Sequence, residues 1–159
     1  MNQKKLASWL KITVITVFII CGLVFFVLIP LVIHKEILIY SQFEHLFWPS
    51  LIYSWGIACI CFACLVIFYG ICDRIGKDRS FCPENANAMF SISKLALVSA
   101  ILSLIGLVIL TVSNCMSAGF LIGFLLFVFI CIAVSVAAAA LSHLIRKAAE
   151  LQSDNDLTV

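Results

Sequence analysis

The chain has 159 residues, of which 64% are hydrophobic and 11% are charged, with a formal net charge of +2. Soluble domains are about 45–50% apolar and about 25% charged, and a chain this short could not bury so much apolar surface in water. The composition therefore excludes a soluble globular fold. It predicts an integral membrane protein with a single domain over residues 1–159.

The first apolar stretch follows a short basic leader. Residues 12–33 carry no charge, and their 22 residues are enough to cross the roughly 30 Å hydrocarbon core as a helix. The stretch is longer than the apolar core of a signal peptide, so we expect a retained helix with a kink near Pro30. Similar stretches follow, and the four predicted spans are 12–33, 49–72, 95–112 and 119–141.

The first loop, from His34 to Trp48, is amphipathic rather than simply polar. Ile39, Phe43 and Phe47 recur at helical spacing with polar side chains opposite, a pattern suited to the headgroup region. The predicted fold class is therefore all-α, with four transmembrane helices in an antiparallel bundle and a short amphipathic segment in the first outer loop. The acids and histidines of this loop lack the ligand spacing of a closed metal site, so we expect no metal and no cofactor.

The central segment 73–94 is the longest polar interruption, and it divides the spans into two pairs. Pro83 suits the first position of a helix, with Glu84 in the first turn and Cys82 as the N-cap. A helix is therefore predicted to begin at Pro83 and to run unbroken into the third span.

Lysine and arginine are distributed unevenly about the predicted spans. Nine of them lie in the N-terminal leader, the central segment 73–94 and the tail 142–159, whereas the opposite side has only Lys35. Basic residues beside spans stay in the cytoplasm. We therefore expect both termini and the central segment to be cytoplasmic. Because topology explains these cations, we expect no direct binding to nucleic acid.

Small residues indicate how the last two spans pack. Ser99, Ser103 and Gly106 share one face of the third span, and the fourth opens with the G-x-x-x-G pattern of Gly119 and Gly123. Because a short turn joins these spans, we expect the two small faces to meet. The G-x-x-x-G pattern is weak evidence for a homo-oligomer, which stays open. The predicted face of the fourth span continues with Ala133, Ala137 and Ala140.

A Cys-x-x-Cys pair, Cys61 and Cys64, lies deep inside the second span. Membrane enzymes that exchange disulfides use such a pair at an oxidising surface, but buried cysteine more often packs as a small apolar residue. Ionisable residues deep in a span, which transporters need, are absent from the sequence. We expect no catalytic residue. A membrane thiol-redox enzyme or a small-molecule permease is the alternative.

The loop Gly-Lys-Asp-Arg-Ser-Phe-Cys-Pro-Glu-Asn-Ala at 76–86, followed by an apolar span, resembles the YoaS-like family of bacterial membrane proteins of unknown function (DUF2975). That family has a Phe-(Thr/Ser)-x-Glu-Asn signature between its second and third helices. Cys82 stands here in place of Thr or Ser. Its chains end in an acidic segment closing in Leu-Thr-Val or Leu-Thr-Ile, as residues 154–159 do.

The resemblance implies a multi-pass protein of the bacterial cell membrane with no established activity. Members are often encoded beside a small helix-turn-helix regulator of the Xre/Cro type, which implies a non-enzymatic regulatory partner that binds or restrains such a regulator. We expect the tail acids to dock on the basic loop residues, or at the start of the Pro83 helix, and to form the partner surface with the loop. Its expected contacts are Phe81, Glu84, Asn85, Asp156, Leu157 and Thr158.

Overall fold

A computed structural model describes residues 3–39, 46–113 and 117–156. Over these ranges the chain is almost wholly helical and contains no strand, which confirms the predicted all-α class. The elements in chain order are α1 (Gln3–Leu23), η1 (Val24–Leu28), α2 (Ile29–Ile39), α3 (Phe47–Gly76), α4 (Pro83–Val112) and α5 (Ala118–Asp156).

The first three elements form one long helix with a π-helical turn in its middle. Pro30 has no N–H to donate and its ring crowds the carbonyl of the residue four positions earlier. The turn just before it is widened, and the backbone N–H of Ile29 donates to the carbonyl of Val24, five residues back. The helix continues to Ile39, beyond the predicted end of the first span. The amphipathic segment predicted for the first loop falls partly on residues 40–45, outside the described residues.

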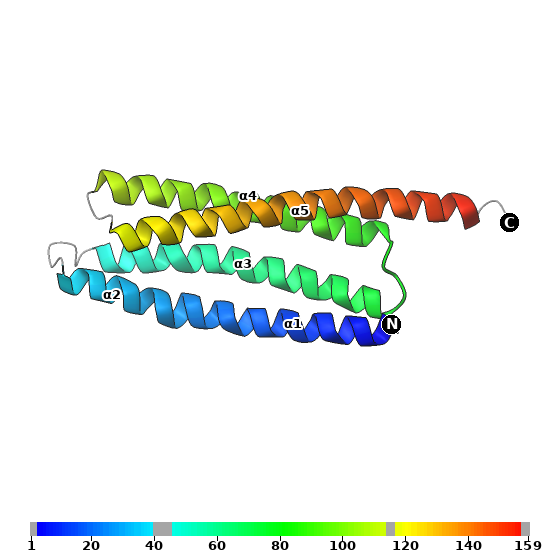
Figure 1. The fold of residues 1–159 in the computed structure, drawn as a ribbon, viewed down its shortest axis with the longest axis horizontal. Helices are drawn as coiled ribbons and strands as arrows, with labels where there is room; N and C mark the ends of the chain where they lie inside the picture. The colour runs from blue at the N-terminus through cyan, green and yellow to red at the C-terminus, as the bar shows by residue number, and fades with distance from the viewer. Residues whose placement is uncertain (1–2, 40–45, 114–116, 157–159) are drawn as a thin grey trace.

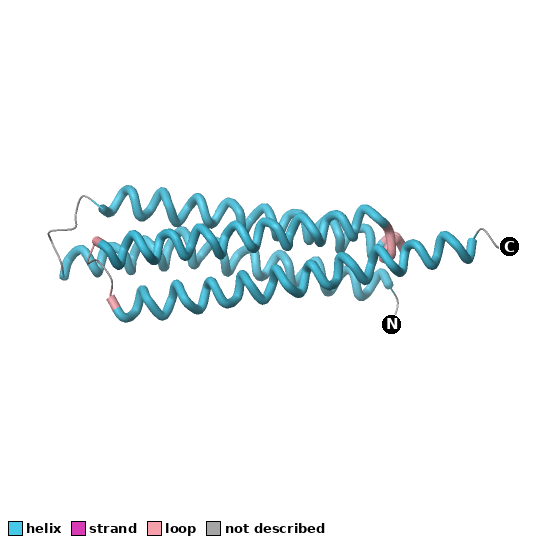
Figure 2. The backbone as a smooth tube through the Cα atoms, turned by 90° about the horizontal axis from the view of Figure 1, so that it is seen from above, coloured by secondary structure: helices cyan, strands magenta, loops and turns pink. Residues whose placement is uncertain are grey.

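The long helices lie side by side and alternate in direction (Figures 1 and 2). The start of α1, the connection between α3 and α4, and the end of α5 share one end of the molecule, which we call the polar end. Within the described ranges, four helical stretches are long and apolar enough to cross a membrane: Lys5–Glu36, Phe47–Gly76, Pro83–Val112 and Ala118–Gln152. The chain is thus a multi-pass membrane protein.

Small and polar side chains hold α4 against α5. The buried positions of α5 are Val128, Cys131, Ser135, Ala138 and Ser142, which alternate in steps of three and four like the seam of a coiled coil. The hydroxyl of Ser135 donates to the carbonyl of Ser93 on α4 at 2.9 Å, and the two hydroxyls are 3.2 Å apart. Such bonds and close packing replace the hydrophobic driving force that lipid removes.

The predicted packing face of α5 was wrong. Gly119 and Gly123 are exposed, and a Cβ added at Gly123 would meet no atom within 4 Å. At about 100° per residue, the two glycines lie on the side of α5 away from the buried seam. The exposed face continues with Ala133, Ala137 and Ala140. The small residues of this face allow close approach but do not contact α4 in the described structure.

The predicted small face of α4 packs against α3 and not against the glycines of α5. Ser99, Ser103 and Gly106 are all buried. A Cβ at Gly106 would lie 2.8 Å from a ring carbon of Tyr53 on α3, so only a residue without a side chain leaves room for that ring. The Tyr53 hydroxyl donates to the carbonyl of Leu102 on the same face.

Aromatic rings fill the contact between the first helix and α3. The ring centroids of Phe18 and Phe62 are 4.6 Å apart, those of Phe26 and Phe62 are 6.3 Å apart, and Phe26 also meets Trp55 at 5.9 Å. Backbone contacts among the described helices run in series from the first helix to α3, α4 and α5. Side chains join the two ends of that series, because the ring centroids of Phe25 and Phe127 lie 6.4 Å apart and Ser117 donates to Glu36 at 3.1 Å.

Candidate docking groove at the polar end

The end of α3 sets the direction of the central loop. The N–H of Asp78 donates to the carbonyl of Ile75 at 3.2 Å, and the N–H of Arg79 donates to that of Arg74 at 3.1 Å. These two bonds form a Schellman motif, which requires a left-handed residue just past the helix. Asp78 takes that place with φ 59°, where glycine is the commonest residue and aspartate is tolerated better than most. The chain therefore reverses sharply at Asp78.

Asn85 fastens the reversed loop to α4. Its side chain is 0% exposed, and its Nδ2 donates to the carbonyls of Arg79 at 3.1 Å and Ser80 at 3.0 Å. Its Oδ1 accepts from Arg74 Nη1 at 3.2 Å. One carboxamide thus satisfies two loop carbonyls and orients the guanidinium of α3. Asn85 was predicted as a partner contact, but its buried side chain is out of a partner's reach and its role is to shape the loop.

The start of α4 follows the sequence prediction. Cys82 is the N-cap residue in an extended conformation and Pro83 is the first helical residue. The N–H groups of Asn85 and Ala86 donate to the carbonyl of Cys82 at 3.0 and 3.3 Å, whereas the Cys82 side chain makes no capping bond. Glu84 is exposed in the first turn with its carboxylate 3.6 Å from Arg79. The helix then continues without a break to Val112, as predicted.

The turns of α5 around Ser142 and Arg146 lie against the first turns of α4. The hydroxyl of Ser142 donates to the carbonyl of Ala86 at 2.7 Å, and Arg146 Nη2 donates to Asn87 Oδ1 at 3.0 Å. With 39 residues, α5 is about 58 Å long, well beyond the roughly 30 Å of the hydrocarbon core. Its last turns therefore project past the loop at the polar end (Figure 1).

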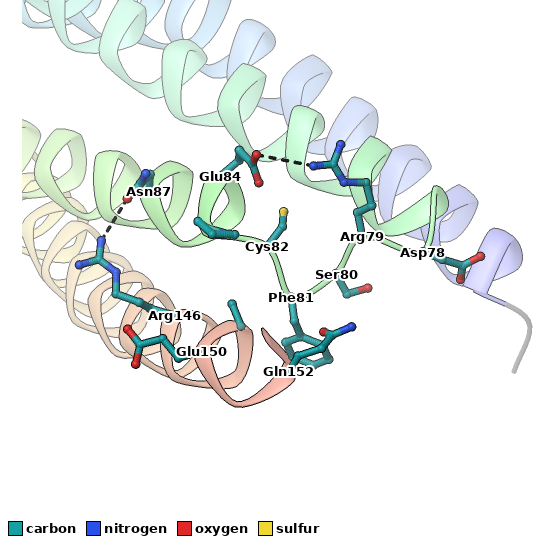
Figure 3. A pocket seen from close by; sticks show the side chains of 12 residues that line it. Asp78, Arg79, Ser80, Phe81, Cys82, Glu84, Asn87, Arg146, Glu150 and Gln152 are labelled. Carbon is teal, nitrogen blue, oxygen red and sulfur yellow. Dashed lines mark hydrogen bonds and ion pairs between the residues drawn. The ribbon is translucent and has the colours of Figure 1, made fainter. Parts of the chain in front are cut away.

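A groove of about 900 Å³ opens between the central loop and this projecting part of α5 (Figure 3). We call it the docking groove. Phe81, with 57% of its surface exposed, lies on the loop side with its ring beside Gln152 of α5, and charged side chains from both walls lie elsewhere around the groove. The lining residues are Asp78, Arg79, Ser80, Phe81, Cys82, Pro83, Glu84, Asn87, Arg146, Ala149, Glu150 and Gln152.

The structure brings only part of the predicted contact set together. Phe81 and Glu84 line the docking groove, and Asp156 is the last residue of α5, beyond the lining residues. Leu157 and Thr158 lie outside the described residues.

The basic residues expected to receive the tail have other partners. Arg74 donates to Asn85, Lys77 lies 2.8 Å from Asp73, and Arg79 faces Glu84. In Figure 1, α5 leads away from the loop as a continuous helix up to Asp156. The described structure therefore shows no return of the tail to these cations.

Sequence reasoning missed the α5 wall of the groove. Arg146, Glu150 and Gln152 face the loop, with Asn87 beside them on α4. Arg146, Ala149 and Gln152 recur every three residues, so a helical signal was present in the sequence. It could not be used because the sequence alone did not say which side of the α5 extension would face the loop.

The cysteines of the Cys-x-x-Cys pair lie among apolar side chains within the bundle. Cys61 packs against the cluster of Phe25, Ile57 and Ala58, and Cys64 packs against a second cluster that contains Ile71. Both are free thiols. The apolar surroundings of both cysteines suit a role as small packing residues.

Comparison with known proteins gives a family and no activity. Residues 31–159 match the family described as "Protein of unknown function (DUF2975)". No curated protein and no solved structure matches the chain. The matched region contains all of α3, α4 and α5, including every residue that lines the docking groove. This chain of four long apolar helices therefore belongs to the DUF2975 family of proteins of unknown function.

Proposed function

We propose that the chain is a non-enzymatic membrane-bound regulatory partner whose docking groove binds a small soluble protein. The expected occupant is a helix-turn-helix regulator of the Xre/Cro type, which the membrane protein would restrain. One observation carries this proposal: an exposed aromatic ring, Phe81, stands in a groove whose two walls are fixed by hydrogen bonds.

The fixed walls favour binding because they reduce the entropy lost on association. The Asn85 side chain fixes the loop backbone at Arg79 and Ser80, and the Schellman motif at Asp78 fixes the start of the loop. On the opposite wall, Ser142 and Arg146 hold α5 against α4. A partner would therefore meet a largely formed surface.

The composition of the groove suits a protein surface. Residues that contribute most to protein binding are often aromatic or arginine side chains near the centre of a contact, with a polar rim around them. Phe81 supplies such an aromatic side chain, and Arg79 and Arg146 supply two arginines. The lining has three acids, Asp78, Glu84 and Glu150, against two arginines. A nucleic-acid surface would concentrate cations, so we propose no direct contact with DNA.

Localisation follows from the charge distribution. The polar end carries the cations of the leader, of the central loop and of α5, whereas Lys35 lies near the opposite end. By the positive-inside rule, we propose that the polar end faces the cytoplasm of a bacterial cell, where a DNA-binding regulator is found. A single cysteine at position 78 in a cysteine-free chain should resist an impermeant thiol reagent on intact cells. Labelling at position 78 but not at position 42 would reverse the orientation.

The direct test measures binding of the purified full-length chain, in detergent, to the helix-turn-helix regulator encoded beside it. Phe81→Ala should weaken the Kd by about 30-fold, because a central aromatic residue contributes about 2 kcal/mol or more. Phe90→Ala is the matched control, since Phe90 is also an exposed phenylalanine of the same region but does not line the groove. Equal binding by both variants would remove the groove from the mechanism.

Two further variants test whether the C-terminal tail and the Cys61–Cys64 pair contribute to binding. Deletion of residues 154–159 should cost less binding than Phe81→Ala, because the described lining of the groove ends at Gln152. Replacement of both Cys61 and Cys64 by alanine should leave binding intact, because we propose no redox chemistry for this pair. Loss of binding in the double variant, with normal membrane insertion, would favour the thiol-redox alternative.

A further inference from the structure

A second and separate groove lies between the first turns of α1 and the last turn of α3. Its volume is about 280 Å³, and it shares no residue with the docking groove. We call it the lysine groove. Its lining residues are Ala7, Ser8, Lys11, Asp73, Gly76 and Lys77.

Two ammonium groups in this groove share one carboxylate. Lys11 Nζ lies 2.6 Å from Asp73 Oδ1, and Lys77 Nζ lies 2.8 Å from Asp73 Oδ2. Two positive charges and one negative charge leave the cluster with a net charge of +1. Each ammonium has three donors, so the carboxylate does not use up their hydrogen-bonding capacity. Asp73 thus holds two cations close together with donors to spare.

The position of the groove matches the level of lipid headgroups. Lys11 immediately precedes the uncharged stretch 12–33, and Asp73 immediately follows the stretch 49–72. Exposed Trp9 and Tyr69 lie near the same level, where aromatic side chains are enriched in membrane proteins. The ammonium of Lys11 also lies over the ring of Tyr69, 5.4 Å from its centroid.

We propose that the lysine groove binds the phosphate of an anionic phospholipid. Lys11 and Lys77 supply the positive charge, and the exposed Ser8 hydroxyl lines the same groove. Basic pockets between transmembrane helices are known to take anionic headgroups. The occupant is a lipid and not free phosphate, because both helices expose apolar side chains beyond the groove, among them Ile12 and Val66, that acyl chains can cover.

The test titrates the purified full-length chain in neutral detergent and follows its thermal unfolding. The added probes are phosphatidylglycerol, phosphatidylcholine and inorganic phosphate. Phosphatidylglycerol is expected to raise the unfolding temperature with a saturable dependence, and the other two are not. An equal rise with phosphatidylcholine, or with inorganic phosphate alone, would overturn the lipid assignment.

Charge variants locate the effect. Lys77→Gln removes one positive charge from the groove and should raise the half-saturating fraction of phosphatidylglycerol about fivefold, the factor expected for one basic residue near an anionic surface. Lys147→Gln makes the same change of net charge on α5, outside the groove, and should stay within about twofold of the parent chain. Equal effects of the two variants would show general attraction in place of a site.

Asp73→Asn gives a result of opposite sign. It raises the charge of the cluster from +1 to +2, so the half-saturating fraction should fall about fivefold. The variant also loses two ion pairs, so its unfolding temperature without lipid should be lower than that of the parent chain. A cluster that only joins α1 to α3 would lower the unfolding temperature without tightening lipid binding, and that result would contradict the proposal.

Discussion

The two halves of the molecule pair their helices by different means. The first helix meets α3 through large aromatic rings, with Phe62 between Phe18 and Phe26. In the second half, α4 meets α5 through small side chains and a hydroxyl bond between Ser135 and Ser93. Rings fill a wide gap by dispersion, whereas small residues let two backbones approach closely. In lipid, where apolar burial alone gives no advantage, both solutions hold helices together.

The halves are joined where α3 meets α4, and the largest effect is expected there. Gly106→Leu places side-chain atoms where Tyr53 already lies, since even a Cβ would be 2.8 Å from its ring. Leucine favours the helix by about 0.8 kcal/mol over glycine, but overpacking typically costs about 1–3 kcal/mol. At the upper end of that range the net destabilisation is about 2 kcal/mol, and we expect that value in detergent unfolding because the overlap with the Tyr53 ring begins at Cβ. A variant as stable as the parent would mean that Tyr53 can move aside at no cost, so that Gly106 does not limit the contact between α3 and α4.

Breaking the aromatic half should have a smaller effect. Phe62→Ala removes both ring pairs of Phe62, each worth about 0.5–1.5 kcal/mol beyond its area. We expect a loss of about 1–2 kcal/mol in unfolding free energy, and Phe62→Leu should recover part of it by filling volume. Phe129→Ala on the exposed face of α5 is the control and should change little. Similar losses in both alanine variants would show that the rings of the first half do not hold it together.

Breaking the hydroxyl contact of the second half should cost less again. Ser135→Ala removes the donor to the Ser93 carbonyl while keeping a small side chain at the seam. Interhelical hydrogen bonds in membrane proteins average about 0.6 kcal/mol, and we expect a loss of that size. A double-mutant cycle with Ser93→Ala separates the hydroxyl contact from packing. A coupling energy of zero would mean that close packing of small side chains, without the hydroxyl contact, holds α4 against α5.

The smallest effect is expected from Gly123→Leu. This is the same substitution as Gly106→Leu, but it lies on an exposed helix face. An added side chain at Gly123 meets no atom within 4 Å. Gly123→Leu should therefore be neutral or stabilising by up to about 0.8 kcal/mol through helix propensity. Strong destabilisation of the monomeric protein would return this face to the α4–α5 contact, and a change in oligomeric state would show that it contacts a second copy.

The sequence predicted the helices better than their faces. Uncharged length identified four spans, and Pro83 with Glu84 placed the start of α4, because both signals depend on local chemistry. The face of α5 that packs depends on the neighbouring helix, and the G-x-x-x-G pattern does not show which helix that is. The serines were a better guide, since Ser135 and Ser142 share a face with Cys131 and Ala138, and hydroxyls in lipid turn toward other helices.

The candidate site shows the same division. Phe81 in the loop and Glu84 in the first turn of α4 both line the groove, and the motif that singled them out is local. Their contact with a partner stays a prediction. Asn85 was misjudged because only the folded loop reveals that its carboxamide meets the carbonyls of Arg79 and Ser80. The α5 wall was missed because it is sixty residues away in sequence and its orientation is set by Ser142 on the carbonyl of Ala86.

The length of α4 and α5 has a mechanical consequence for the groove they share. The groove has one wall at the start of α4 and the other near the end of α5, and both helices continue without a break to the opposite end of the molecule. Each hydrogen-bonded turn of a helix constrains the next, so tilting at one end is carried to the other. The Ser93–Ser135 contact joins the two helices between those ends. A change in the angle between α4 and α5 about that contact would therefore change the width of the docking groove.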